Sequence, residues 1–203
     1  EVVYRNLAEK ASYRLTVAAL ELRNLKRDMD MPLKFSGGFV DEGSGFKASL
    51  DVQAVLRVSE DGAINASVES LELAASQAAN SIQASAQGSF SRTAEGAVAA
   101  SIAKFDAQGT LNAVALKASL QGKLNQAADG DVNGSLSALN FSAEKGKARL
   151  AASMASDFGF SPEKETVSLT IRQGKLQDAS FSGNALVSLP RPSAAKAPRG
   201  LGL

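Results

Sequence analysis

The stretch from Gly62 to Phe158 repeats itself with a period of 34 residues. An acidic residue followed by glycine separates the units, and apolar residues recur in register within them. The recurring sets include Ile82, Leu116 and Leu150, then Phe90, Leu124 and Phe158, with Asp61-Gly62, Glu95-Gly96 and Asp129-Gly130 between units. A fixed period of this size is typical of one supersecondary unit stacked on copies of itself. We therefore expect three stacked units, at 62–95, 96–129 and 130–158.

The second half of each unit alternates strictly between apolar and polar residues. In the first copy, Ile82 and Ala84 alternate with Gln83 and Ser85. Period two indicates a strand with one dry and one wet face, whereas a helix would bring serines onto the apolar stripe. The predicted dry face, and the candidate site, consists of Ile82, Ala84, Ala86, Phe90, Leu116, Ala118, Leu120, Leu124, Leu150, Ala152, Met154 and Phe158.

The first half of each unit is also extended, but its alternation breaks once. Ile64 and Val68 share one parity, and Leu71 and Leu73 share the other. The break recurs in the other two copies, which predicts a β-bulge at the same place in each unit. Each unit is thus a predicted β-hairpin. The Asp-Gly links suit tight turns with positive φ, and the links near 77–80 suit looser ones.

Alanine and serine dominate the composition, with 36 and 25 residues respectively. Alanine is a poor strand former, so propensity alone would favour helices. Three aligned copies of a period-two pattern outweigh that weak preference. We therefore predict an all-β protein.

The segments outside the repeats complete the predicted sheet. We expect a frayed leader at 1–12, a repetitive β-sheet domain at 13–189 and a disordered tail rich in Pro, Ala and basic residues at 190–203. Further strands are predicted at 13–25, 32–41, 46–59, 163–173 and 175–189. Together they give a long antiparallel meander of about eleven amphipathic strands.

The dry face of such a sheet must be covered, and the sequence offers no helix to cover it. Two architectures satisfy this constraint: a sheet curled into an open groove that holds an apolar ligand, or a two-sheet sandwich. Small residues between the large ones on the dry face leave space, which favours the groove. The alternating sizes would also let two facing sheets interdigitate, so the sandwich stays an alternative.

Several chemistries are excluded or disfavoured by the residues present. The chain has no His and no Cys, so imidazole and thiol chemistry are excluded. A net charge of +1 gives no electrostatic footprint for nucleic acid. Asp129 to Asn133 resembles the start of a calcium loop, but Asn140 stands where the bidentate Glu belongs. We expect no catalytic residues, no metal and no cofactor.

Two stretches outside the repeats have a characteristic rhythm: YRLTVAALELRNLKRDMDMPLKFSGGFVDEG at 13–43 and GFKASLDVQAVLRV at 45–58. With these stretches and, more diffusely, with its repeats, the domain at 13–189 resembles the AsmA family of Gram-negative envelope proteins. The resemblance implies a periplasmic protein tethered to the inner membrane by an N-terminal helix. Such an anchor would lie outside this chain, which we expect to be the middle segment of a longer protein.

The resemblance also implies a function. It implies a hydrophobic β-groove for phospholipid, or another acyl-chain lipid, moving between the inner and outer membranes and serving outer-membrane assembly. Strand-edge pairing with the rest of the full-length protein is a further expectation. The alternative is a structural spacer or protein-interaction module with a closed β core.

Overall fold

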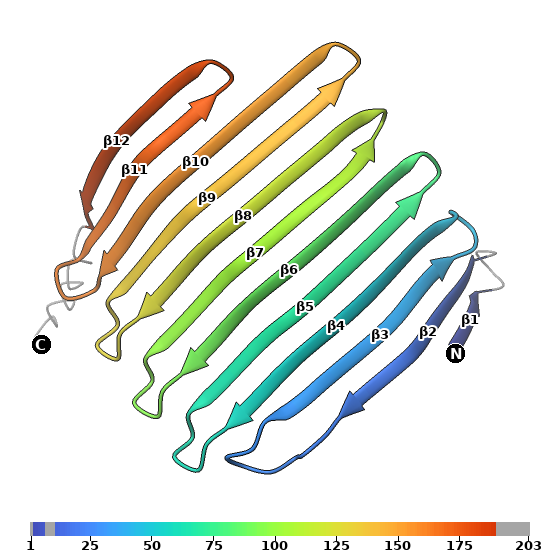
Figure 1. Ribbon diagram of the computed structural model, residues 1–203, viewed down its shortest axis with the longest axis horizontal. Helices are drawn as coiled ribbons and strands as arrows, with labels where there is room; N and C mark the ends of the chain where they lie inside the picture. The colour runs from blue at the N-terminus through green and yellow to red at the C-terminus, as the bar shows by residue number, and fades with distance from the viewer. Residues whose placement is uncertain (1, 7–10, 190–203) are drawn as a thin grey trace, which may run out of the picture.

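The computed structural model describes residues 2–6 and 11–189, all of them in strands or the turns between them (Figure 1). The predicted tail at 190–203 lies outside the described residues. The strands are β1 Val2–Asn6, β2 Ala11–Leu22, β3 Met31–Asp41, β4 Phe46–Val58, β5 Ile64–Gln77, β6 Asn80–Arg92, β7 Val98–Leu111, β8 Val114–Gln126, β9 Val132–Lys145, β10 Ala148–Ser161, β11 Thr166–Leu176 and β12 Ala179–Ser188.

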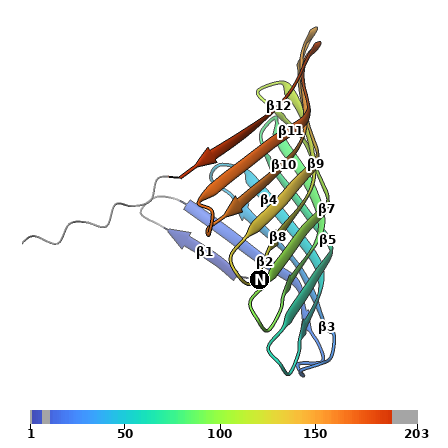
Figure 2. The same ribbon diagram turned by 90° about the vertical axis from the view of Figure 1, so that its left-hand side faces the viewer.

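All twelve strands form one antiparallel sheet in chain order. The predicted meander is confirmed, and the two-sheet sandwich is not found. The sheet is open and curled, with β1 and β12 turned toward the same side (Figure 2). The count exceeds the expected eleven because β1 lies within the segment predicted as a frayed leader. Val2, Val3 and Tyr4 favour a strand, and the Tyr4 ring stacks on Tyr13 at 6.2 Å.

The sheet is a single layer. The chain exposes 14358 Å², whereas a compact monomer of this mass would expose about 9,000 Å². Among the described residues, only Met31, Ser156 and Gly174 are buried. Residues 2–6 and 11–189 include no helix long and apolar enough to cross a membrane. Hydrogen bonds between neighbouring strands therefore hold the fold together, without a conventional core.

One line of β-bulges crosses the sheet, as the phase break predicts. The register of β5 against β6 shifts between Val68 and Leu71, and the equivalent shift occurs in β7 and β9. The unpaired residues of the repeats are Glu69, Ala103 and Ser137, spaced by the repeat length. Each extra residue returns the apolar side chains to the same face. The apolar face is consequently continuous from one hairpin end to the other.

The acidic-glycine links adopt the predicted positive φ. Gly62, Gly96 and Gly130 have φ of 88°, 93° and 93°. Each closes the same turn, in which the glycine N–H donates to a carbonyl three residues earlier at 3.0–3.1 Å. These links span five residues between strands, so they are longer than expected.

The opposite hairpin ends are the tight ones, contrary to the prediction. β5 and β6 are joined by Ala78 and Ala79 alone, and Ala78 has a φ of 52°. Asn112 and Ala113 join β7 and β8 with φ of 50° and 62°. Two residues with positive φ match the right-handed twist of the flanking strands. The sequence hides these turns because they contain no glycine.

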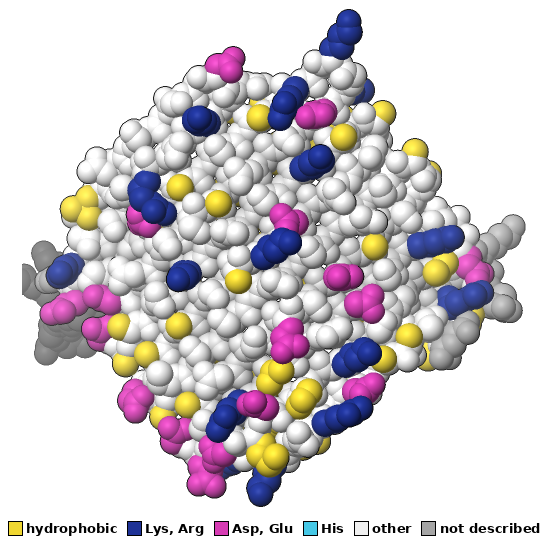
Figure 3. All heavy atoms as spheres, viewed as in Figure 1, with side chains coloured by type: hydrophobic (Ala, Val, Ile, Leu, Met, Phe, Trp, Pro, Cys, Tyr) yellow, Lys and Arg dark blue, Asp and Glu magenta, His cyan; other side chains and the backbone are white. Residues whose placement is uncertain are grey.

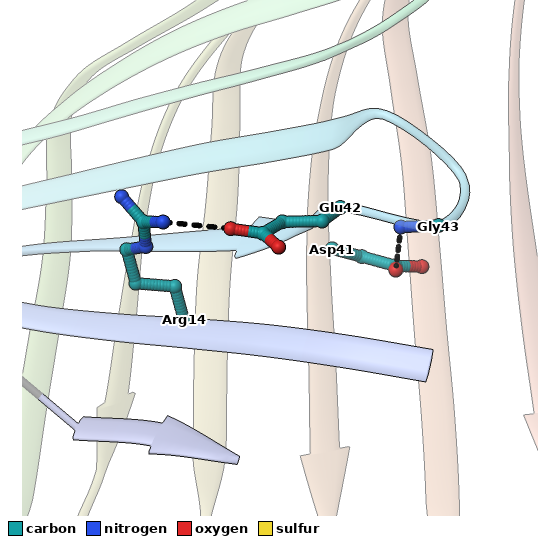
Figure 4. Close-up of polar contacts among 4 residues, drawn as sticks. All are labelled: Arg14, Asp41, Glu42 and Gly43. Carbon is teal, nitrogen blue, oxygen red and sulfur yellow. Dashed lines mark hydrogen bonds and ion pairs between the residues drawn. The ribbon is translucent and has the colours of Figure 1, made fainter. Parts of the chain in front are cut away.

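The turn between β3 and β4 is held by side-chain contacts, one of which comes from β2 (Figure 4). Arg14 of β2 donates to Glu42 at 2.7 Å, and Asp41 accepts the Gly43 N–H at 2.9 Å. The hydroxyl of Ser44, bonded to Asp41 at 2.5 Å, is the main cause that lowers the pKa of Asp41. The ionised Asp41 therefore stabilises the turn. This stabilisation is present above the ordinary pKa of an aspartate and is lost as pH falls through the lowered pKa of Asp41.

Replacing Ala113 by glycine should stabilise the protein. A side chain in the left-handed region costs about 1 kcal/mol, which glycine avoids, and Asn-Gly is the preferred pair for this turn. We expect the free energy of unfolding to rise by about 1 kcal/mol, measured by urea denaturation. The matched control, Ala115→Gly in β8, should lower it by about 0.5–1 kcal/mol. Equal effects of the two changes would contradict the turn assignment.

Candidate functional site

The candidate site is one face of the sheet, here called the apolar face, and it is built from rows of paired residues. One row runs through Phe90, Ala100, Leu124, Gly134 and Phe158 on β6 to β10. A second runs through Ile82, Gly109, Leu116, Ala143 and Leu150 on the same strands. Residues directly opposite in an antiparallel pair share a face, so each row is a continuous apolar line.

All twelve predicted residues lie on this face. They come from β6, β8 and β10 only, and the register aligns each set of three across the intervening strands. None is buried. The side chains of Ile82, Phe90, Leu150 and Phe158 are 40–47% exposed. The sequence therefore places these residues together correctly.

Sequence reasoning missed the half of the face that β5, β7 and β9 supply. Ile102 and Phe105 lie on the apolar face with Leu120, although their parities differ. The bulge between them hid this, because parity along a strand no longer reports the face once one residue is unpaired. The repeat itself held the missing signal. Leu136 and Leu139 show the same spacing one unit later.

Large and small side chains alternate from strand to strand between β6 and β10 in the two rows just described. Phe158 lies over Gly134, where an added Cβ would approach the ring to 2.1 Å. Phe181 covers Gly174 in the same way, with 2.3 Å to an added Cβ. Aromatic rings thus lie flat on the glycines of neighbouring strands. These rings shield the backbone beneath them from water and form a thin apolar layer over it.

The opposite face, here called the polar face, carries the charges. Figure 3 shows Lys, Arg, Asp and Glu side chains scattered over it. Short hydrogen bonds cross it, including Ser89 Oγ to Ser101 Oγ at 2.8 Å and Asn140 Nδ2 to Ser119 Oγ at 3.0 Å. In contrast, the paired residues of β4 to β11 on the apolar face are uncharged between the strand ends. The two faces therefore differ in chemistry throughout.

Each face has a shallow hollow, as expected for a twisted, saddle-shaped sheet. The larger, about 920 Å³, lies on the polar face and includes Asp51, Glu72 and Lys175 in its lining. The smaller, about 430 Å³, lies on the apolar face and includes Ile82 and Phe141. The hollow on the polar face is the larger candidate binding site. Only the hollow on the apolar face, however, offers a water-poor surface to a hydrocarbon chain.

The sequence resembling a calcium loop forms an ordinary turn. Asp129 Oδ1 accepts the Asp131 N–H at 3.0 Å, and the hydroxyl of Ser161 donates to Asp131 Oδ1 at 2.8 Å. No cluster of three Asp or Glu side chains suited to a metal ion occurs within 2–6 and 11–189.

Comparisons with protein-family models, curated proteins and solved structures gave no match. The AsmA-like assignment therefore stays a prediction.

Contact between Phe158 and Gly134 should be measurable as an energetic coupling. Gly134→Ala forces the ring off its neighbour, so we expect a loss of about 1–3 kcal/mol in the free energy of unfolding. The same change in a Phe158→Ala background should cost at least about 0.5 kcal/mol less, because the clash is gone. Chemical denaturation of the four proteins measures both quantities.

Gly183 provides the matched control on the same face. An alanine Cβ there meets no atom within 4 Å. Gly183→Ala should therefore be neutral or stabilising by up to about 1 kcal/mol. A loss at Gly183 equal to that at Gly134 would show that backbone strain, rather than the Phe158 ring, sets the cost.

Proposed function

We propose that this chain is a non-enzymatic lipid-handling segment whose apolar face carries phospholipid acyl chains. One observation carries the proposal: a continuous, uncharged apolar face that no second layer of the described residues covers. Exposed apolar patches beyond a few hundred Å² mark binding surfaces. Here such a surface runs across the whole repetitive region.

The energetics favour an acyl chain as the occupant. Burying apolar surface yields about 25 cal/mol per Å², and each CH₂ group contributes about 0.8 kcal/mol. The half-exposed Phe90 and Phe158 offer this area without needing directional partners. An acyl chain needs no hydrogen bonds, which the apolar face does not provide. The polar face, with its serines and charges, stays in water.

The dimensions suit transfer as well as binding. Strands lie about 4.8 Å apart, so twelve strands span about 53 Å. One leaflet of a bilayer core is about 15 Å thick, so a single acyl chain would cover three or four strands. Neighbouring repeats offer equivalent positions at Ile82, Leu116 and Leu150. A lipid could therefore move from unit to unit without a large change in free energy.

Periplasmic location and an inner-membrane tether belong to the same proposal, and they rest on the resemblance to the AsmA family. Pairing of a free sheet edge with the rest of a longer protein also belongs to it. The alternative, a structural spacer or protein-interaction module, requires a closed β core. The single layer formed by the described strands gives that alternative less support.

Photo-crosslinking distinguishes the two faces. Benzoylphenylalanine at Ala84, Leu120 or Met154 should capture phospholipid when the purified chain is mixed with phosphatidylethanolamine–phosphatidylglycerol vesicles. The same probe at Gln83 or Lys123, on the polar face, should capture at least tenfold less. Equal labelling of the two faces would remove the lipid-groove proposal.

A single charge on the apolar face should harm lipid capture before it harms folding. Leu120 is only partly buried, so an aspartate there can reach water, and we expect a loss of at most about 2 kcal/mol in stability. Circular dichroism should show a folded sheet, while capture by a probe at Met154 falls at least tenfold. Gln121→Asp on the polar face is the matched control and should change neither. Unfolding of Leu120→Asp would instead indicate a packed core.

A further inference from the structure

The outer edge of β12 is unpaired among the described residues and carries neither a charge nor a proline. β12 pairs with β11 on one side and, within the described part of the chain, with no strand on the other. Every residue from Ala179 to Ser188 is exposed, and none is charged or proline. Edge strands are normally protected from pairing by charges, prolines or bulges. This edge is therefore competent to pair with another strand.

The backbone of β12 presents its free hydrogen-bonding groups at defined residues. The Leu189 N–H donates to the Glu165 carbonyl across the β11–β12 pair at 2.6 Å. The backbone N–H and C=O groups of successive residues point to opposite edges of a strand. Every second residue of β12 therefore points both groups away from β11. These residues are Ser180, Ser182, Asn184, Leu186 and Ser188.

We propose that two copies of this chain pair antiparallel through β12, about a two-fold axis normal to the sheet at Gly183. Since β12 is uncharged, self-pairing brings no like charges together. The axis keeps both apolar faces on the same side, so the two sheets become one. The axis also places Ser182 of one copy opposite Asn184 of the other. The backbone groups that point away from β11 in each copy can then hydrogen-bond to one another.

The pattern of side-chain sizes sets the register. At several pairs of the sheet a large residue faces a small one, as Phe90 faces Ala100, Leu169 faces Ala185 and Phe181 faces Gly174. With Gly183 opposite its own copy, Phe181 faces Ala185 and Val187 faces Ala179. Moving the axis by one residue, to Asn184, would instead place Phe181 against Val187. The first register continues the observed alternation, and the second breaks it.

The opposite edge of the sheet fits a partner less well. β1 covers only Ala11–Leu15 of β2, so that edge is stepped. The uncovered part of β2 also carries Glu21, which pairs with Arg23 at 2.6 Å. A second copy joined head to tail would meet this step and this charge. Self-pairing of β12 avoids both, and it closes as a dimer instead of growing into a filament.

Cysteine cross-linking tests the axis directly, because the chain has no cysteine of its own. A Gly183→Cys variant of the whole chain should form a disulfide-linked dimer under mild oxidation with oxidised glutathione. A Cβ at this position meets no atom of its own chain within 4 Å. Asn184→Cys, one residue along on the polar face, should link at least tenfold more slowly. Faster linking at 184, or none at either position, would overturn the proposed register.

Sedimentation equilibrium tests the pairing without a cross-link. Asn184→Pro removes an outward N–H and takes no hydrogen bond from β11, so the dimerisation constant should weaken at least tenfold. Asn184→Ala removes the same side chain, retains the N–H and should dimerise like the unaltered chain. Circular dichroism checks that both variants keep the sheet. A monomeric unaltered chain at several hundred micromolar, or an Asn184→Pro variant that dimerises normally, would overturn the proposal.

Discussion

The hydrogen-bond ladder between neighbouring strands is the interaction on which this protein depends. A second layer would normally bury one face of the sheet, and the described residues supply none. Only Met31, Ser156 and Gly174 are buried among them. Stability must therefore come from backbone pairing and from side chains that lie flat along the sheet. The contact of Phe158 with Gly134 represents the second kind, since the ring covers backbone that a facing sheet would otherwise cover.

The bulge line turns this ladder into a two-faced surface. If Ala103 were paired like its neighbours, Ile102 and Phe105 on β7 would point to opposite faces, because side chains alternate along a regularly paired strand. Ile102 would then lie among the serines. The extra residue in each unit keeps one face apolar along the full strand length. A device of backbone geometry thus produces the chemical difference between the faces, and the proposed lipid function depends on that difference.

Openness has two consequences for a single-layer sheet. The apolar face, which no second layer of the described residues covers, is the proposed lipid surface, and the β12 edge, unpaired among those residues, is the proposed site for another strand. The two features are independent, because one uses side chains and the other uses backbone groups. A dimer through β12 would nevertheless extend the apolar face of each copy across the axis. Binding on the face and pairing at the edge can therefore be altered separately, at Leu120 and at Asn184.

The sequence alone determined every described strand except β1, their order as a meander and the shared face of the twelve predicted residues, because a 34-residue repeat and a period of two leave few other solutions. It also located the bulges through a change of parity. Only the tertiary structure decided that the strands form one layer, since either a sandwich or an open sheet would satisfy the same pattern. It also decided that Ala78 and the pair Asn112-Ala113 make the tight turns, because the twist of paired strands imposes positive φ where the residues themselves do not favour it. The half of the apolar face on β5, β7 and β9 likewise required the register, because a residue's face after a bulge depends on its partner strand.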